Sequence, residues 1–222
     1  MGVPNDNRND GNIITYLSQP YKWEKYDADL FLSLKIIIDN NEKRTVQMIE
    51  NCELFKNAEY FSLLVPDLKI ERSIWFNKLL DISKNKFIFL DPDNGLEVKS
   101  KVYGRKESSK YIFWDEISCL WRNGNSLLIY QHFPRVNRNN YISNILGKLS
   151  QFTIGSKVDA FYTSHVVYLL ALQPVHQAFY NDIRFAIEKK WSGKISCWSI
   201  GIAAPRFVSK PEDVIIIKKG DD

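Results

Sequence analysis

Two carboxylates follow directly on a short apolar run in the segment FIFLDPDNGLEVKSK, residues 87–101. The run predicts a buried strand, and Asp91 and Asp93 stand at its carboxyl end, where open α/β sheets bind ligands. Turn chemistry alone explains the Pro and the Asn-Gly pair, but it requires only one of the two carboxylates. We therefore predict Asp91 and Asp93 as catalytic residues, with Pro92 and Asn94 in the loop that binds the substrate.

A second apolar run, residues 126–130, ends in the polar sequence Gln-His-Phe-Pro-Arg. His132 is one of three histidines in the chain, and an imidazole at a strand end can transfer protons or simply fill the edge of the sheet. Arg135 and Arg138 can hold phosphate or face water. We predict His132 as a third catalytic residue and both arginines as substrate-binding residues. The strand expected at residues 195–203 also ends beside a Pro and an Arg.

Apolar runs and helical patterns alternate along the chain. We expect strands within residues 59–67, 86–92, 126–134, 164–174, 194–205 and 212–219. We expect helices within residues 26–39, 70–84, 108–124, 139–152 and 175–193. Asp27 or Asp29 is expected to cap the first of these, and Ser108 or Ser109 to start the third. Strands that are continuously apolar and alternate with helices predict an α/β domain with a mostly parallel sheet between two helical layers. This three-layer Rossmann-like fold is expected to include residues 1–222 in one domain, with a polar, flexible start at 1–12.

Composition excludes several classes of protein. The three cysteines, Cys52, Cys119 and Cys197, lie far apart without a C-x-x-C pair, which argues against a zinc knuckle and indicates a reducing, cytoplasmic location. No apolar run approaches the roughly 18 residues of a membrane span, and the first twelve residues lack the apolar core of a signal peptide. The net charge of +4 permits an anionic partner such as nucleic acid without requiring one.

The order of these elements resembles the methyltransferase version of the Rossmann fold. FIFLDPDNGLEVKS is similar to the Asp/Asn-Pro-Pro-aromatic strand ending of adenine-amino methyltransferases, especially those of large-subunit ribosomal RNA, in which a Glu and a Lys follow. The resemblance implies S-adenosylmethionine as the cofactor and nucleic acid as the substrate. It also implies that Asp91 accepts a hydrogen bond from the reacting amino group, while Arg135 or Arg138 contacts phosphate.

A set of longer motifs resembles a family of bacterial and phage-borne proteins that has little established activity. The matching segments are NDGNIITYL, ERSIWF, FLDPDNGLE, SKYIFWDEI and YQHFPR, and together they span most of the chain. Members usually begin with an Asp-Lys-Tyr helix and a first strand. The resemblance therefore implies that Met1 opens a shortened version without the first element of the sheet.

The sequence departs from the methyltransferase pattern at the residues that carry the chemistry. Asp93 replaces the second proline and Asn94 replaces the aromatic residue that stacks on the base. No G-x-G-x-x-G motif is present, and the expected place of the cofactor loop is taken by the polar NDNRNDGN. By position alone, Asp10, Gly11 and Asn12 are the predicted cofactor-binding residues.

Two other functions stay open at this point. Asp91, Asp93 and Glu97 could hold Mg²⁺ for a nuclease or phosphodiesterase, with Lys99 or His132 placed for charge stabilisation or proton transfer. The missing glycine loop instead favours a non-catalytic, Rossmann-like binding protein of a phage or defence locus. No structural metal site and no membrane partner are expected.

Overall fold

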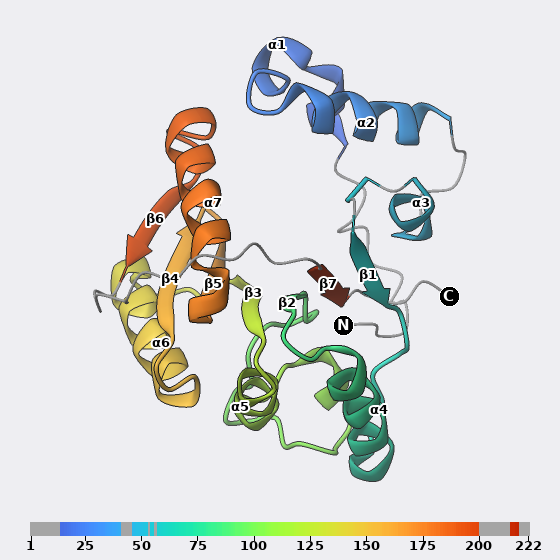
Figure 1. The fold of residues 1–222 in the computed structure, drawn as a ribbon, viewed down its shortest axis with the longest axis vertical. Coiled ribbons are helices and arrows are strands. Elements are labelled where there is room, and N and C mark those ends of the chain that lie inside the picture. The colour runs from blue at the N-terminus through green and yellow to red at the C-terminus, as the bar shows by residue number, and fades with distance from the viewer. Residues whose placement is uncertain (1–13, 41–45, 53, 56, 200–213, 218–222) are drawn as a thin grey trace.

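The structure is a computed structural model, and it describes residues 14–40, 46–52, 54–55, 57–199 and 214–217 (Figure 1). The start expected to be flexible, residues 1–12, lies outside the described residues. So does the predicted strand end at residues 204–206.

One seven-stranded sheet forms the centre of the described chain, in the order β1-β7-β2-β3-β5-β4-β6. Four strands are mutually parallel: β1 (Ala58–Phe61), β7 (Val214–Ile217), β2 (Phe87–Leu90) and β3 (Ser126–His132). The other three strands add on in antiparallel pairs: β5 (Val166–Leu172), β4 (Lys157–Tyr162) and β6 (Ser196–Ser199). The sheet is therefore mixed, with a parallel half and an antiparallel half.

The prediction of a mostly parallel, three-layer Rossmann-like sheet of the methyltransferase type is wrong. Residues 157–162, for which no strand is predicted, form β4 and return through a three-residue turn into β5. Thr163 Oγ1 accepts hydrogen bonds from the backbone N–H groups of His165 and Val166. Two strands joined by so short a turn must run antiparallel, because a parallel connection needs a dozen or more residues.

The two faces of the sheet bury different side chains. One face packs Ile88, Leu127 and Ile129 against helices α4 (Lys69–Ile82), α5 (Trp114–Arg122) and α6 (Arg138–Phe152). The opposite face packs Phe87 and Leu170 against α7 (Gln177–Lys190), which lies in front of β4 and β5 in Figure 1. Successive side chains of β2 and β3 point to opposite faces of the sheet, and this alternation decides which residues at the strand ends share a face.

Helix starts follow local capping chemistry. Asp27 accepts from the backbone N–H of Leu30 at 3.0 Å, as predicted, and so begins α2 (Ala28–Asp39). The start predicted at Ser108 or Ser109 is wrong, because these residues form the short 3-10 helix η3 (Ser108–Lys110). α5 begins only after Phe113, whose N–H donates to Glu116. The remaining helical segments are η2 (Thr15–Ser18), α1 (Pro20–Trp23), α3 (Val46–Asn51) and η4 (Pro174–His176). None of the helices within the described ranges combines the length and apolarity that crossing a bilayer requires.

A buried serine–histidine contact holds the start of α7 against the sheet. His176 is 2% exposed, and its Nδ1 lies 2.7 Å from the Oγ of Ser126. The same Oγ accepts from the backbone N–H of Gln173, so its own hydrogen is available to a neutral His176. Burial lowers the pKa of His176, so the imidazole stays uncharged in the folded protein. The pair is a structural contact.

We predict that the free energy of unfolding falls as the pH drops from about 6.5 towards 5. The unfolded chain binds a proton at His176 with an ordinary pKa, whereas the folded chain resists that proton. Urea unfolding at several pH values should show this loss for the wild-type protein and for His132→Gln, and a smaller loss for His176→Gln. An unchanged pH dependence in His176→Gln contradicts the prediction.

Candidate ligand-binding edge of the sheet

The two polar strand ends singled out in the sequence lie at one edge of the sheet. β2 and β3 are parallel neighbours, with Leu90 opposite Ile129. Continuing this register places Asp91 beside Tyr130, with His132 two residues further along β3 on the same face. The carboxylate and the imidazole therefore share the carboxyl edge.

Two tyrosines lie between and beside these groups. Tyr130 is opposite Tyr168 of β5, and their rings meet edge to face at 5.5 Å. The hydroxyl of Tyr130 lies 3.4 Å from Nε2 of His132. Burial, with smaller effects of Tyr168 and Asp91, raises the pKa of Tyr130 to about 12. Burial, followed by the Asp91 charge, also raises the pKa of Tyr168. We call Tyr130 and Tyr168 the tyrosine platform; both phenols remain protonated donors at neutral pH.

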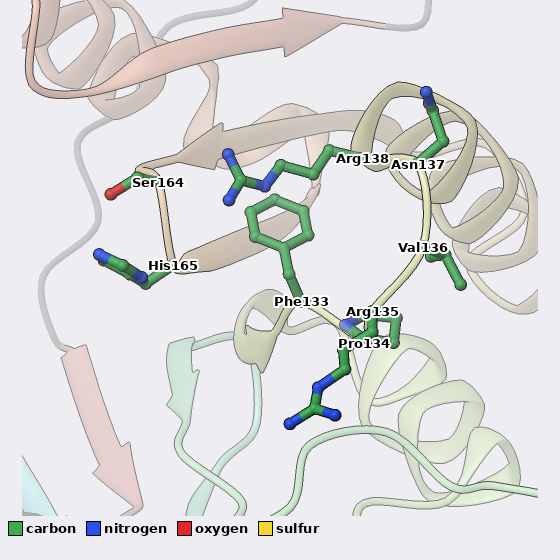
Figure 2. Close-up of a pocket in the computed structure, with 8 residues that line it drawn as sticks. All are labelled: Phe133, Pro134, Arg135, Val136, Asn137, Arg138, Ser164 and His165. Atoms are coloured by element: carbon green, nitrogen blue, oxygen red, sulfur yellow. The ribbon is translucent and has the colours of Figure 1, made fainter.

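A basic pocket of about 520 Å³ opens where β3 ends (Figure 2). It is formed by the loop from β3 into α6 and by the turn between β4 and β5. Its lining residues are Phe133, Pro134, Arg135, Val136, Asn137, Arg138, Ser164 and His165. None of the eight is acidic, while two are arginines and one is a histidine, so the pocket favours an anion.

Local contacts hold the two sides of the basic pocket together. The backbone N–H of Phe133 donates to the carbonyl of His165 at 3.3 Å. The guanidinium of Arg138 lies over the Phe133 ring at 5.4 Å and points towards Ser164 in Figure 2. Asn137 caps α6 by accepting from the N–H of Asn140. The contact with the Phe133 ring thus positions the Arg138 guanidinium at the basic pocket.

An apolar recess of about 230 Å³ lies on the α7 side of the sheet. Its walls are Phe87, Leu128, Phe161, Tyr168, Leu170, Ile183, Ile187 and Ile195. Tyr168 belongs both to this recess and to the tyrosine platform. A flat apolar group in the recess would therefore lie next to the polar groups of the carboxyl edge.

The Asp-Pro-Asp-Asn-Gly turn is packed tightly on β3. Gly95 has φ +83°, and a Cβ at this position would come within 2.1 Å of the Gln131 side chain. Only glycine fits this approach without displacing its neighbour. Gln131 Oε1 accepts from the N–H of Leu96 at 2.7 Å, and the N–H of Asn94 donates to the carbonyl of Lys110. The turn is thus fixed to β3 on one side and to residues 110–112 on the other.

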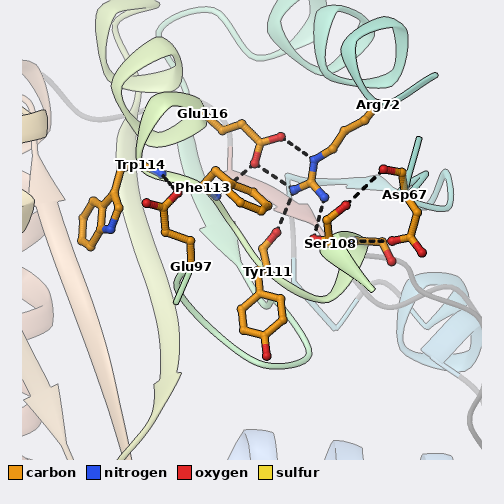
Figure 3. A network of polar contacts seen from close by, with 9 residues as sticks. Asp67, Arg72, Glu97, Ser108, Tyr111, Phe113, Trp114 and Glu116 are labelled. Atoms are coloured by element: carbon orange, nitrogen blue, oxygen red, sulfur yellow. Dashed lines mark hydrogen bonds and ion pairs between the residues drawn. The ribbon is translucent and has the colours of Figure 1, made fainter. Parts of the chain in front are cut away.

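A fully buried arginine holds that second side in place (Figure 3). Arg72, with 0% exposure, makes a bidentate ion pair with Glu116, with Nε to Oε1 at 2.7 Å and Nη2 to Oε2 at 2.9 Å. Its remaining donors reach the carbonyls of Ser108 and Tyr111, each at 2.7 Å. We call these contacts the Arg72 network. They tie α4 and α5 to the loop that supports the turn.

Aromatic rings and a second carboxylate complete the surroundings of Arg72. The guanidinium lies over the rings of Tyr103 and Phe113 at 5.2 and 4.9 Å. Asp67 accepts from the N–H groups of Glu107 and Ser109, each at 2.8 Å. Although burial alone would raise the pKa of the Asp67 carboxyl, these hydrogen bonds and the Arg72 charge lower it. The loop is therefore held by charge-assisted contacts at both ends.

The predicted site residues are distributed over this edge unevenly. Arg135 and Arg138 share the basic pocket, and Asp91 and His132 both lie beside Tyr130. Pro92 is buried within the turn. Asp93 faces Lys110 at 3.8 Å and Asn94 is tied to the same segment through its backbone, so both face the supporting loop. The predicted cofactor-binding residues Asp10, Gly11 and Asn12 lie outside the described residues.

The three carboxylates considered for Mg²⁺ do not converge. Glu97 Oε2 accepts from the backbone N–H of Trp114 at 3.2 Å, while Asp93 pairs with Lys110. Across the parts of the chain that the structure describes, no three or more His, Cys, Asp and Glu side chains gather as a metal site. The carboxylates of Asp91, Asp93 and Glu97 therefore do not form a shared site, because Asp93 and Glu97 contact different partners.

The sequence alone did not predict the tyrosine platform or the side of the basic pocket that the turn between β4 and β5 forms. Tyr130 lies within an apolar run, a position that is typical of a core residue. One signal was available, because Tyr130 and His132 are two residues apart and so share a face. Nothing local indicated Tyr168, since β5 pairs with β3 only through the tertiary fold.

No family model, curated protein or solved structure gives a significant match to this chain.

Replacing Arg72 with Ala leaves the buried Glu116 without its cation, so we expect the free energy of unfolding to fall by about 3–5 kcal/mol. The control is Glu59→Gln, which breaks the partly exposed pair with Lys86 and is expected to cost at most about 1 kcal/mol. Urea denaturation followed by tryptophan fluorescence measures both. A loss for Arg72→Ala as small as that of the control would show that the network is not essential.

Proposed function

We propose that this chain binds nucleic acid at the carboxyl edge of its sheet. The observation that carries the proposal is the basic pocket, which gathers Arg135, Arg138 and His165 without an acidic neighbour in its lining. The tyrosine platform and Asp91 lie on adjoining strands of the same edge. This combination provides separate partners for the phosphate and the base of one nucleotide.

The phosphate would be bound in the basic pocket. Arginine forms two parallel hydrogen bonds to phosphate oxygens and keeps its charge at all relevant pH values. Arg135 and Arg138 are both exposed, so a ligand reaches them without a rearrangement of the core. His165 adds a further donor from the opposite side of the pocket.

The base would stack against the tyrosine platform and extend into the apolar recess. Stacking on an aromatic side chain contributes about 1–3 kcal/mol per base and tolerates any sequence. Asp91 would select among bases, because a carboxylate accepts from the exocyclic amino group of adenine or cytosine. A carboxylate offers about four acceptor positions, so such a bond can join the contacts that Asp91 already makes.

Methyl transfer from S-adenosylmethionine, which the resemblance to adenine methyltransferases implies, stays a prediction. Asp91 would then orient the reacting amino group, as the motif suggests. Mg²⁺-dependent cleavage of nucleic acid likewise stays a prediction. Binding of nucleic acid requires neither methyl transfer nor cleavage.

The double substitution Arg135→Ala/Arg138→Ala is expected to weaken binding of a fluorescent eight-nucleotide DNA about tenfold or more at 100 mM salt. The physical reason is the loss of charge-assisted hydrogen bonds to phosphate, each contributing roughly 1.5–3 kcal/mol. Fluorescence anisotropy measures the dissociation constant, and Arg105→Ala/Arg122→Ala serves as the control with the same change of charge. Equal affinities for the two double variants would contradict the assignment of the pocket.

Asp91→Ala is expected to remove a preference for bases that carry an amino group. The wild-type protein should bind oligo-dA and oligo-dC more tightly than oligo-dT by about fivefold or more, since one hydrogen bond to a charged acceptor contributes roughly 1.5–3 kcal/mol. In Asp91→Ala the three affinities should converge towards that of oligo-dT. Competition with unlabelled oligonucleotides gives the ratios. A wild-type protein without this preference would remove Asp91 from the base site.

A further inference from the structure

A second basic surface forms where α1 packs against the end of α7. The rings of Tyr26 and Trp191 stack at 5.1 Å with an interplanar angle of 20°. Lysine ammonium groups lie over this aromatic group, with Lys194 at 5.1 Å from the Trp23 ring and 6.0 Å from the Tyr26 ring. We call the following six residues the α1–α7 patch: Lys22, Trp23, Lys25, Tyr26, Trp191 and Lys194.

The patch is basic: it holds three lysines, while Glu24 lies between Lys22 and Lys25 in the sequence and Asp27 caps α2. Lys22, Lys25 and Lys194 are exposed, and no ion pair with another described residue is found for any of the three. Lys189 and Lys190, in the last turn of α7, are also exposed and add to the field. The nearest carboxylate along α7, Glu188, is paired with Arg184. Lysines interleaved with aromatic rings are the composition of a nucleic-acid contact surface.

Strand register places the patch at the same edge as the basic pocket. Ser196, at the start of β6, is opposite Tyr162, at the end of β4. Tyr162 is opposite Val167, and Val166 is opposite His132. Three steps between neighbouring strands, about 15 Å in total, therefore separate the end of β3 from the start of β6.

The apolar recess adjoins the tyrosine platform on one side and the residues next to Trp191 on the other. Ile187 and Ile195 line it, and Trp191 lies between them in sequence, with its N–H donating to the carbonyl of Ile187 and its carbonyl accepting from Ile195. Tyr168 lines the recess on the side of the tyrosine platform. A chain that leaves the basic pocket thus passes an aromatic and apolar surface before it meets the lysines.

From this arrangement we infer that the ligand is a single strand of nucleic acid that spans both basic surfaces. The inference rests on the proposed function, and it specifies the form of the ligand. Phosphates would contact the basic pocket and the α1–α7 patch, while the bases between them face the tyrosine platform and the recess. In a duplex the bases are paired and stacked on one another, and so they are not available to this surface.

Binding of fluorescent oligonucleotides of two, four, eight and twelve nucleotides tests the inference, with DNA and RNA series measured separately. The wild-type affinity should rise at least about tenfold between two and eight nucleotides and then level off. The variant Lys22→Gln/Lys25→Gln/Lys194→Gln should lose most of this gain while it still binds the dinucleotide like the wild type. Its slope of log K against log salt should be shallower by up to about 2, because each phosphate contact to a single strand contributes about 0.7.

The matched control is Lys78→Gln/Lys84→Gln/Lys106→Gln, which removes the same charge from exposed residues outside this edge. It should keep the length dependence, and thermal unfolding should show that both triple variants are folded. If the α1–α7 variant binds every length like the wild type while Arg135→Ala/Arg138→Ala is weakened, the inference is overturned and the proposed function stands. If duplex binds more tightly than single strand, the inference is also overturned. If wild-type protein binds no oligonucleotide, both fail.

Discussion

The buried ion pair between Arg72 and Glu116 is the contact on which the candidate edge depends. A guanidinium with no access to water loses its hydration, and this cost is offset only when nearly every donor has a partner. Here the carboxylate takes two of its hydrogen bonds and the carbonyls of Ser108 and Tyr111 take two more. Two segments that are remote in sequence, α4 and residues 108–116, are thereby fixed around one charge, and two aromatic rings cover it.

The consequences of this pair reach the edge of the sheet in two steps. The segment held by Arg72 pairs with the Asp-Pro-Asp-Asn-Gly turn, because Ile112 donates to the carbonyl of Gly95 and accepts from the N–H of Glu97. Next to this turn, the N–H of Leu96 donates to Gln131 of β3. Asp91 is thus presented beside Tyr130 by a rigid support. Arg72, Gly95, Glu116 and Gln131 lie in the segments ERSIWF, FLDPDNGLE, SKYIFWDEI and YQHFPR, so each of these four segments contributes a residue to the support of this edge.

The sequence was informative where structure is decided locally. The apolar runs located β2 and β3, the periodic pattern with its Asp27 cap located α2, and the strand-end rule identified the residues Asp91, His132, Arg135 and Arg138 as neighbours at one edge. The direction of β5 was not predictable from its sequence, because its apolar run fits either orientation. The short turn at Thr163 decides the direction, but it indicates a hairpin only once β4 is recognised as a strand, and the polar residues Lys157 and Asp159 obscure that strand. Arg72 and Glu116 are 44 residues apart, and no local pattern links them. Tyr130 and Tyr168 resembled core residues, since an aromatic ring in a strand looks the same whether it is covered by a helix or lines an open edge.

The central claim is that nucleic acid lies across the carboxyl edge, and photochemical crosslinking tests it most directly. An oligonucleotide that carries a photoreactive base in its middle would be irradiated in complex with the protein, and the crosslinked peptides would be identified by mass spectrometry. The account predicts crosslinks at Tyr130 or Tyr168 and at peptides that include Phe133 or Trp191. Crosslinks confined to α4 and α5, which contribute no residue to the basic pocket, the tyrosine platform or the recess, would contradict it.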